Sequence, residues 1–115
     1  MMYTVVKSYS DAPESPIEVR KGEELQFVEE SDPDGNWPNW VFCRGAEKEG
    51  WVPKQILEFG QFKVHVLQDY CAREHTLAVG EVLLKEYELN GWIWCQKIEG
   101  SKESGWAPLN HLAIV

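Results

Sequence analysis

Two side chains with nucleophile and base chemistry lie close together in the sequence, at Cys71 and His75. A thiolate beside an imidazole base is a pairing that nucleophilic catalysis uses. No third orienting group and no oxyanion donor accompanies them. Cys43 and Cys95 occupy equivalent places in a repeat described below, which favours small buried core residues over a catalytic pair. The sequence therefore predicts no catalytic residues, and we expect the protein not to be an enzyme.

Residue spacing gives no better support for a metal or phosphate site. The 3 His and 3 Cys are scattered, without the ligand spacing of a zinc centre. Asp32 and Asp34 lie in Ser-Asp-Pro-Asp-Gly, which is typical of a turn, because the later bidentate Glu of a calcium loop is missing. No glycine-rich loop that could hold phosphate is present. We expect no metal and no cofactor.

The elements that carry these residues form an internal repeat. Four segments return in the same order: Val5–Tyr9 as Val66–Tyr70, Gly22-Glu23 as Gly80-Glu81, Trp40–Cys43 as Trp92–Cys95, and Gly50–Pro53 as Gly105–Pro108. An apolar pair precedes each Gly-Glu, namely Ile17 with Val19 and Leu77 with Val79. Four ordered matches indicate two related units.

Each unit has the pattern of short strands separated by turns. Residues 24–28, 40–43 and 81–84 are β-branched, aromatic or alternating, and Asn90-Gly91 is a turn signal. The fold class is therefore all-β. We expect two small barrels of about five strands each, with no helix beyond a short 3₁₀ turn near Lys54-Gln55 or Leu109-Asn110. The repeat places the domains at 1–58 and 63–115, with Phe59 and Phe62 packed where they meet.

In order and spacing, these motifs resemble the Src-homology-3 (SH3) family. Val66–Ala72 is similar to that family's ALYDYEA opening, and the later Gly-Glu, Trp, Cys and Gly-Trp-x-Pro positions follow in both units. The resemblance covers nearly the whole chain. The Gly-Trp-Val-Pro form is closer to bacterial and variant members than to animal signalling domains. The resemblance implies two tandem SH3-like barrels.

It also implies a groove between aromatic ridges that binds proline-containing peptides in an extended conformation. The implied groove residues are Tyr9, Trp40 and Pro53 in the first unit, and Tyr70, Trp92, Pro108 and Asn110 in the second. We expect the rings of Trp40 and Trp92 to face this groove. Trp51 and Trp106, inside the Gly-Trp-x-Pro strand, are expected to cover the barrel.

Acidic residues near the groove would meet a basic residue of the ligand. These acids are Asp11, Glu14, Asp32 and Asp34 in the first unit and Glu74 in the second. Other groove positions depart from the family, which has Tyr where this chain has Gln68 and His111. The first unit departs at Lys7, Gln55 and Ile56.

Three functions stay open. The leading hypothesis is a non-enzymatic interaction module that binds a protein or peptide, proline-rich or basic. The second is a structural or regulatory protein whose aromatic faces are buried between the barrels or in a homo-oligomer. The third is recognition of cell-wall peptides, as in bacterial relatives of this fold.

Charge and cysteine content limit the partners and the compartment. The net charge is −8, from 19 acidic and 11 basic residues, which disfavours nucleic acid and anionic membranes as partners. An odd number of Cys (3) favours a reduced compartment. No secretory signal or long apolar run is visible. We expect a cytoplasmic protein, unless a leader has been removed.

Overall fold

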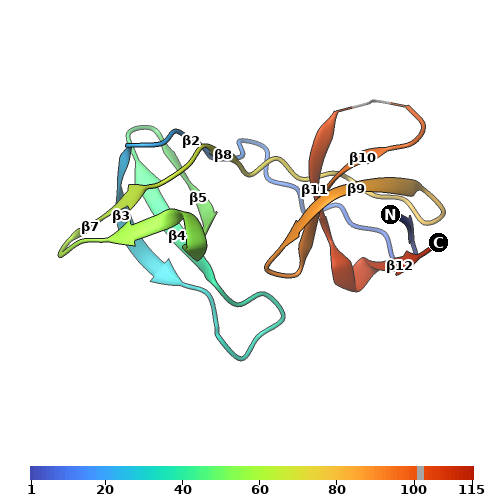
Figure 1. Ribbon diagram of the computed structural model, residues 1–115, viewed down its shortest axis with the longest axis horizontal. Helices are drawn as coiled ribbons and strands as arrows, with labels where there is room; N and C mark the ends of the chain where they lie inside the picture. Colours follow the sequence, from blue (N-terminus) through green and yellow to red (C-terminus); the bar gives the residue numbers. More distant parts are fainter. Residues whose placement is uncertain (101–102) are drawn as a thin grey trace. The chain divides into compact units, whose positions relative to one another are not determined.

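The computed structural model describes residues 1–100 and 103–115, and the fold is all-β (Figure 1). The strands are β1 (Met2–Val5), β2 (Glu18–Val19), β3 (Glu24–Glu30), β4 (Trp40–Gly45), β5 (Lys48–Pro53), β6 (Leu57–Phe59), β7 (Lys63–Val66), β8 (Tyr70–Cys71), β9 (Val82–Leu89), β10 (Trp92–Lys97), β11 (Ser104–Pro108) and β12 (Leu112–Ile114). They form two five-stranded antiparallel sheets and one two-stranded sheet. This confirms the all-β prediction and its two five-stranded sheets.

The chain divides into two compact units, and the division differs from the contiguous domains at 1–58 and 63–115 that the repeat predicts. One unit combines Met1–Glu14 with Arg73–Val115, and we call it the split unit. The other consists of Ser15–Ala72, and we call it the continuous unit. The first repeat therefore gives its N-terminal segment to the unit that holds most of the second repeat.

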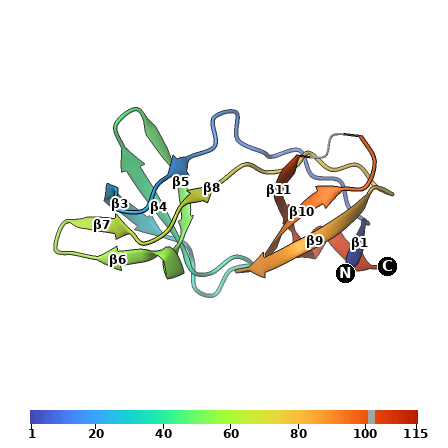
Figure 2. The same cartoon turned by 45° about the horizontal axis from the view of Figure 1, so that its top comes forward.

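The sheet of the split unit has the order β11-β10-β9-β1-β12 (Figure 2). The turn at Asn90 and Gly91 has φ angles of 50° and 86°, the left-handed values that a two-residue hairpin needs. This turn pairs Leu89 directly with Trp92 and so starts the β9–β10 hairpin. The fully buried side chains of Leu83, Ile93 and Cys95 form its core.

The sheet of the continuous unit has the order β5-β4-β3-β7-β6, and β2 pairs separately with β8. Its strands bury some side chains and expose others: β3 buries only Leu25, whereas β7 buries Val64 and Val66. Its core cluster comprises Ile17, Val19, Leu25, Val41, Cys43, Val52, Ile56, Leu57, Val64, Val66 and Ala72. Cys43 is therefore a small core residue, as predicted.

The segment predicted to link two domains is a hairpin inside the continuous unit (Figure 2). β6 and β7 are separated only by residues 60–62, and Leu57 pairs with Val66 across them. The Gly60 N–H donates to the Lys63 carbonyl at 2.8 Å and closes the turn. The expected packing of Phe62 between domains is wrong, because its side chain is 80% exposed. Phe59 contacts Phe27 within the same unit.

Equivalent hydrogen bonds show how the strands have been exchanged. In the continuous unit, Gly22 N–H donates to the Val66 carbonyl at 2.8 Å. In the split unit, the matching Gly80 N–H donates to the Val5 carbonyl at 2.9 Å. Val66 and Val5 are repeat equivalents, so each unit uses the first strand of the other repeat. The short turn explains the exchange, because β7 folds back on β6 and occupies the position that β1 would otherwise take.

Each unit contains one 3₁₀ turn that follows a Gly-Trp-x-Pro strand. The turns are η1 (Lys54–Ile56), which lies between β5 and β6, and η2 (Leu109–His111), which lies between β11 and β12. Pro53 and Pro108 cap them in an extended conformation, with φ of −61° and −75°. Both turns confirm the prediction made from the proline positions.

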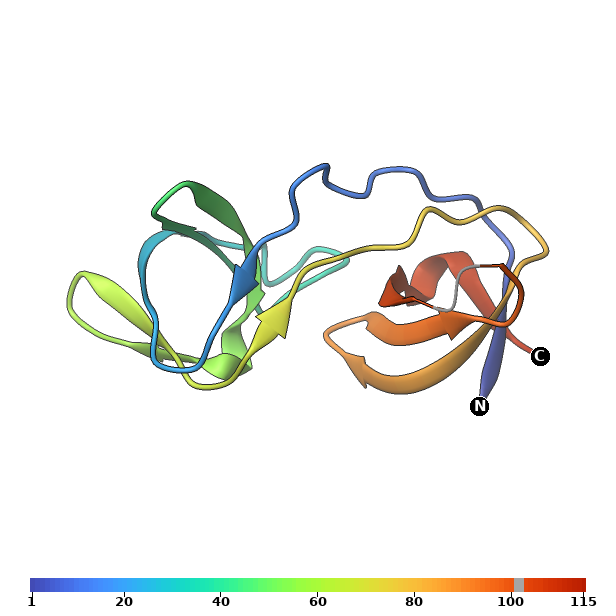
Figure 3. The same cartoon turned by 90° about the horizontal axis from the view of Figure 1, so that it is seen from above.

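The two ends of the described chain belong to the split unit (Figure 3). β1 pairs with β12, with Tyr3 opposite Ile114 and Thr4 opposite Ala113. Among the described residues, no helix has the length and apolar character that crossing a membrane would require.

Candidate functional site

The aromatic site of the split unit is built around Tyr9. Its ring lies edge-on to Trp92, with 5.7 Å between centroids, and edge-on to His111 at 5.4 Å. Backbone hydrogen bonds to Leu77 hold Tyr9 in place, at 3.0 and 2.8 Å. The N-terminal segment thus carries the tyrosine, whereas residues from the second repeat carry the rings that it touches. Sequence reasoning had placed Tyr9 with Trp40 and Pro53 instead.

An acidic group lies directly on the tyrosine hydroxyl. The Tyr9 hydroxyl donates a hydrogen bond to the Glu74 carboxylate. Burial raises the pKa of the Glu74 carboxyl, although the bond from Tyr9 acts against this, and the charge of Asp11 raises it further. Burial, followed by the bond to Glu74 and the negative charges of Glu74 and Asp11, raises the pKa of the Tyr9 hydroxyl. Glu74 and Asp11 together make this side of the aromatic site negative.

The tryptophan and proline predicted for this site are present but largely covered. Trp92 pairs directly with Pro108 across β10 and β11. Trp92 is 7% exposed and Pro108 is fully buried, so neither forms the open ridge expected from the sequence. Asn110 is exposed on η2, and His111 is half-buried beside it. The accessible part of the site is therefore its polar rim.

The His111 ring replaces the tyrosine that the family has at this position. Its Nδ1 lies 3.1 Å from the carbonyl oxygen of Ser8 and 3.2 Å from that of Lys7. The ring thus connects η2 to the N-terminal segment on one edge and contacts Tyr9 as well. Sequence reasoning counted His111 as a lost groove residue, whereas the structure makes it a wall of the site.

The continuous unit contains the corresponding site with the other tyrosine. Tyr70 lies against Trp40, with 6.4 Å between ring centroids, and Trp40 pairs with Pro53 across β4 and β5. Trp40 is 7% exposed, like Trp92, while Tyr70 is half-buried. The hydroxyl of Ser31 accepts a hydrogen bond from the backbone N–H of Trp40 at 3.0 Å. This site again combines residues that the sequence had assigned to separate grooves.

The remaining predicted acids lie on exposed loops. The Asp34 N–H donates to the Asp32 carboxylate at 2.9 Å, and Gly35 N–H donates to the Asp32 carbonyl at 3.1 Å. These bonds define a turn, as the sequence indicated. Glu14 is exposed at the end of the N-terminal segment. Within residues 1–100 and 103–115, no group of three or more His, Cys, Asp or Glu residues could hold a metal ion.

The expected roles of the other two tryptophans are half right. Trp106 is buried and contacts Trp94, with 5.2 Å between centroids, so it covers the barrel as predicted. Trp51 is 39% exposed and lies against Phe42 on the outside of the continuous unit. The Trp51 ring is therefore partly accessible to solvent, contrary to expectation.

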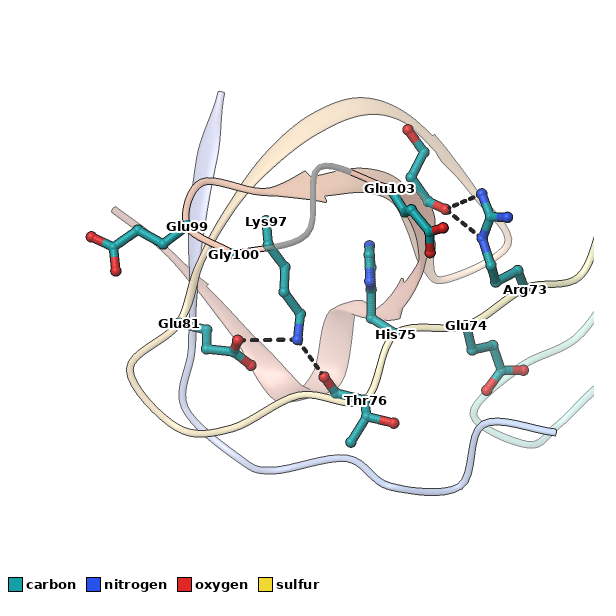
Figure 4. A pocket seen from close by; sticks show the side chains of 10 residues that line it. Arg73, Glu74, His75, Thr76, Glu81, Lys97, Glu99, Gly100 and Glu103 are labelled. Atoms are coloured by element: carbon teal, nitrogen blue, oxygen red, sulfur yellow. Dashed lines mark hydrogen bonds and ion pairs between the residues drawn. The ribbon is translucent and has the colours of Figure 1, made fainter. Parts of the chain in front are cut away.

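A hollow of about 310 Å³ lies on the split unit (Figure 4), and sequence reasoning missed it. The Lys97 ammonium bonds to the Glu81 carboxylate at 3.0 Å and to the Thr76 carbonyl at 2.7 Å. The Arg73 guanidinium donates two bonds to the Ser104 carbonyl. Lys97 is therefore paired with a carboxylate, whereas Arg73 is held by a neutral carbonyl. Glu74, Glu99 and Glu103 also line the hollow.

His75 lines this hollow and is half-buried, at the repeat position where the continuous unit has the buried Ile17. Counted back from the Gly-Glu pair, His75 is equivalent to Ile17, and Leu77 to Val19. Val79, which the sequence comparison had included in the apolar pair, is 66% exposed. The His75 Nε2 donates to the Cys95 carbonyl at 2.9 Å, and burial is the main factor that lowers the pKa of its imidazole. Cys71 has a different partner, the Glu18 carboxylate, at 3.5 Å.

Comparison with known families identifies the first repeat. A family model described as a variant SH3 domain matches residues 2–60. The β-sheet region after residue 60 is not assigned by that model. Searches of curated proteins and of solved structures gave no match. The matched stretch is contiguous in sequence, whereas its first strand lies in the split unit.

Proposed function

Because the chain belongs to the variant SH3 domain family, we propose that it is a non-enzymatic module that binds extended segments of other proteins. Domains of this type generally bind peptides or proteins. The proposed ligand is a segment that carries basic residues, with proline favouring its extended form. The 3 free cysteines and the net charge of −8 support a cytoplasmic protein that does not bind nucleic acid or anionic membranes.

The observation that carries this proposal is the contact of Tyr9 with both Glu74 and Trp92. It joins a carboxylate to the edge of an aromatic cluster in the split unit. Asp11 adds a second negative charge close enough to influence the pKa values of Tyr9 and Glu74. A lysine or arginine of the ligand would meet these acids, and its neighbours would lie along Asn110 and His111. Because Trp92 is buried, a ligand that contacts the polar rim fits this site better than one that packs on an open aromatic ridge.

A nuclear magnetic resonance titration with basic and proline-containing peptides tests the site. We expect the amide signals of Tyr9, Glu74 and Asn110 to shift. The variants Glu74→Gln and Asp11→Asn should each weaken binding by about 3- to 10-fold, because they remove a ligand-facing charge without changing side-chain size. Binding should also weaken as salt is raised to about 0.5 M. Asp34→Asn, an exposed acid of the continuous unit, is the matched control and should leave this affinity unchanged.

A second candidate function rests on the burial of Trp40 and Trp92, each 7% exposed. Rings that are already covered suit a structural or regulatory protein whose aromatic faces serve its own assembly. This alternative is supported if no peptide shifts the amide signals of Tyr9, Glu74 and Asn110, and if Glu74→Gln changes the stability of the protein but not its binding.

A further inference from the structure

The N-terminal arm, residues 1–9, contributes an inserted strand to the split unit. β1 lies between β9 and β12, with Tyr3 opposite Leu83 on one side and Ile114 on the other. The Val5 N–H donates to the Glu81 carbonyl at 2.9 Å. A central strand satisfies backbone groups on both neighbours, so without the arm β9 and β12 would each expose a row of unpaired groups.

Side chains of the arm complete the same unit. Tyr3, Val5 and Tyr9 are buried, and Tyr9 contacts Trp92 and His111. The arm therefore supplies both the missing strand and part of the aromatic cluster. The space between β9 and β12 is a binding slot whose specificity lies in these side chains and in the strand register.

The tether that connects the arm to the rest of the chain, residues 10–16, has little regular structure. It forms no strand and contains Pro13 and Pro16. Among residues 1–100 and 103–115, this segment makes no backbone–backbone hydrogen bond, and its prolines have no N–H to donate. Proline also keeps such a segment extended.

We infer that the slot between β9 and β12 also binds the arm of a second copy of this chain, which gives a reciprocally exchanged dimer. The slot makes the same contacts whichever chain supplies the arm, because every group that it recognises lies within residues 1–9. The balance between the closed monomer and the exchanged dimer then depends on protein concentration and on strain in the tether. The chain already exchanges equivalent strands between its own repeats, so the dimer extends an exchange that the fold tolerates.

A pair of engineered cysteines distinguishes an arm from the same chain from the arm of another. Met2 and Leu84 face each other across β1 and β9, and both are exposed. One chain would carry Met2→Cys and the other Leu84→Cys, both with Cys71→Ser to remove the half-exposed native thiol. The two chains are unfolded together, refolded at increasing concentration and oxidised. Non-reducing electrophoresis then measures the disulfide-linked heterodimer.

We expect the heterodimer to accumulate as the refolding concentration approaches the millimolar range, on the order of the effective concentration set by a short tether. A matched pair with Val79→Cys in place of Leu84→Cys should give only background, since Val79 is an exposed residue of the same unit that does not face Met2. Light scattering of the unmodified chain, refolded in the same way, should show a dimer mass. Equal yields for Leu84→Cys and Val79→Cys, or a monomer mass throughout, would overturn the proposal.

A single chain that carries both Met2→Cys and Leu84→Cys checks that the slot is filled at all. At low concentration it should form a disulfide within one chain, which moves faster on the gel. If this bond fails to form at every concentration, the arm does not occupy the slot and the proposal is wrong.

Discussion

The ring of Tyr9 lies edge-on to Trp92, with 5.7 Å between centroids, although the two residues belong to different repeats. The equivalent pair in the continuous unit is Tyr70 with Trp40 at 6.4 Å. Each aromatic site is therefore completed by the exchanged segment of the other repeat. Any change that alters strand exchange also alters both sites.

Truncating one buried valine in each first strand tests the exchange directly. Val5→Ala should perturb amide signals in residues 73–115, because Val5 packs in the split unit, and it should leave Ser15–Ala72 largely unchanged. Val66→Ala should do the reverse. Each should lower the free energy of unfolding by roughly 1 to 3 kcal/mol, because both side chains are almost fully buried. Contiguous domains would instead give Val5→Ala its effect within residues 2–60.

The sequence predicts the strands and turns of this chain well but not which first strand joins which sheet. The reason is visible in Val5 and Val66, which match in the repeat, are both buried and make the same bonds to a Gly-Glu turn. Local patterns cannot rank two equivalent partners. The length of the β6–β7 connection, residues 60–62, decides between them, and a repeat comparison treats that connection only as a boundary.

The sequence predicts which residues form the candidate site but not which of them are exposed. Tyr9, Trp92 and Pro108 were identified, but their burial depends on the packing around them, which the pattern does not describe. His111 was missed as a ring contact because the comparison sought a tyrosine there. The equivalence of His75 with Ile17 was missed because the apolar pair Leu77 and Val79 was aligned two positions away from its structural match.

The burial of Trp92 predicts a cost in stability rather than a selective loss of binding. Trp92→Ala should lower the free energy of unfolding by about 3 to 5 kcal/mol, the usual cost of removing a buried aromatic ring. Trp51→Ala, at a ring that is 39% exposed, should cost about 1 kcal/mol or less. Urea unfolding measures both. A Trp92→Ala protein as stable as the Trp51→Ala protein would restore the open-groove interpretation.

The cysteines should differ sharply in reactivity. Burial raises the pKa of the Cys43 thiol to about 11 and that of Cys95 to about 12, so little thiolate exists at neutral pH. Labelling with a thiol reagent should modify the half-exposed Cys71 first, and the other two only after unfolding. Cys43→Ser should cost roughly 1 to 3 kcal/mol by placing a hydroxyl in an apolar core. Rapid native labelling of Cys43 or Cys95 would contradict their burial.

His75 gives the split unit a dependence on pH with a defined sign. Burial of its imidazole disfavours the protonated form, and the positive charges of Lys97 and Arg73 disfavour it as well. These effects hold the pKa of His75 below its ordinary value of 6.5, although the bond to Cys95 and the charge of Glu81 act against them. As the pH falls through 6.5, the unfolded chain binds this proton before the folded chain does. The free energy of unfolding should therefore decrease.

His75→Leu isolates this contribution, because leucine is close in size to the Ile17 that fills the equivalent position. Glu74 has a raised pKa and stabilises the fold as the pH falls, so the two proteins must be compared with each other at every pH. Urea unfolding between about pH 7.5 and pH 5 should show the unmodified chain losing stability relative to the His75→Leu variant. Two stability curves that stay parallel over this range would show that the His75 imidazole binds its proton equally well in the folded and unfolded chains.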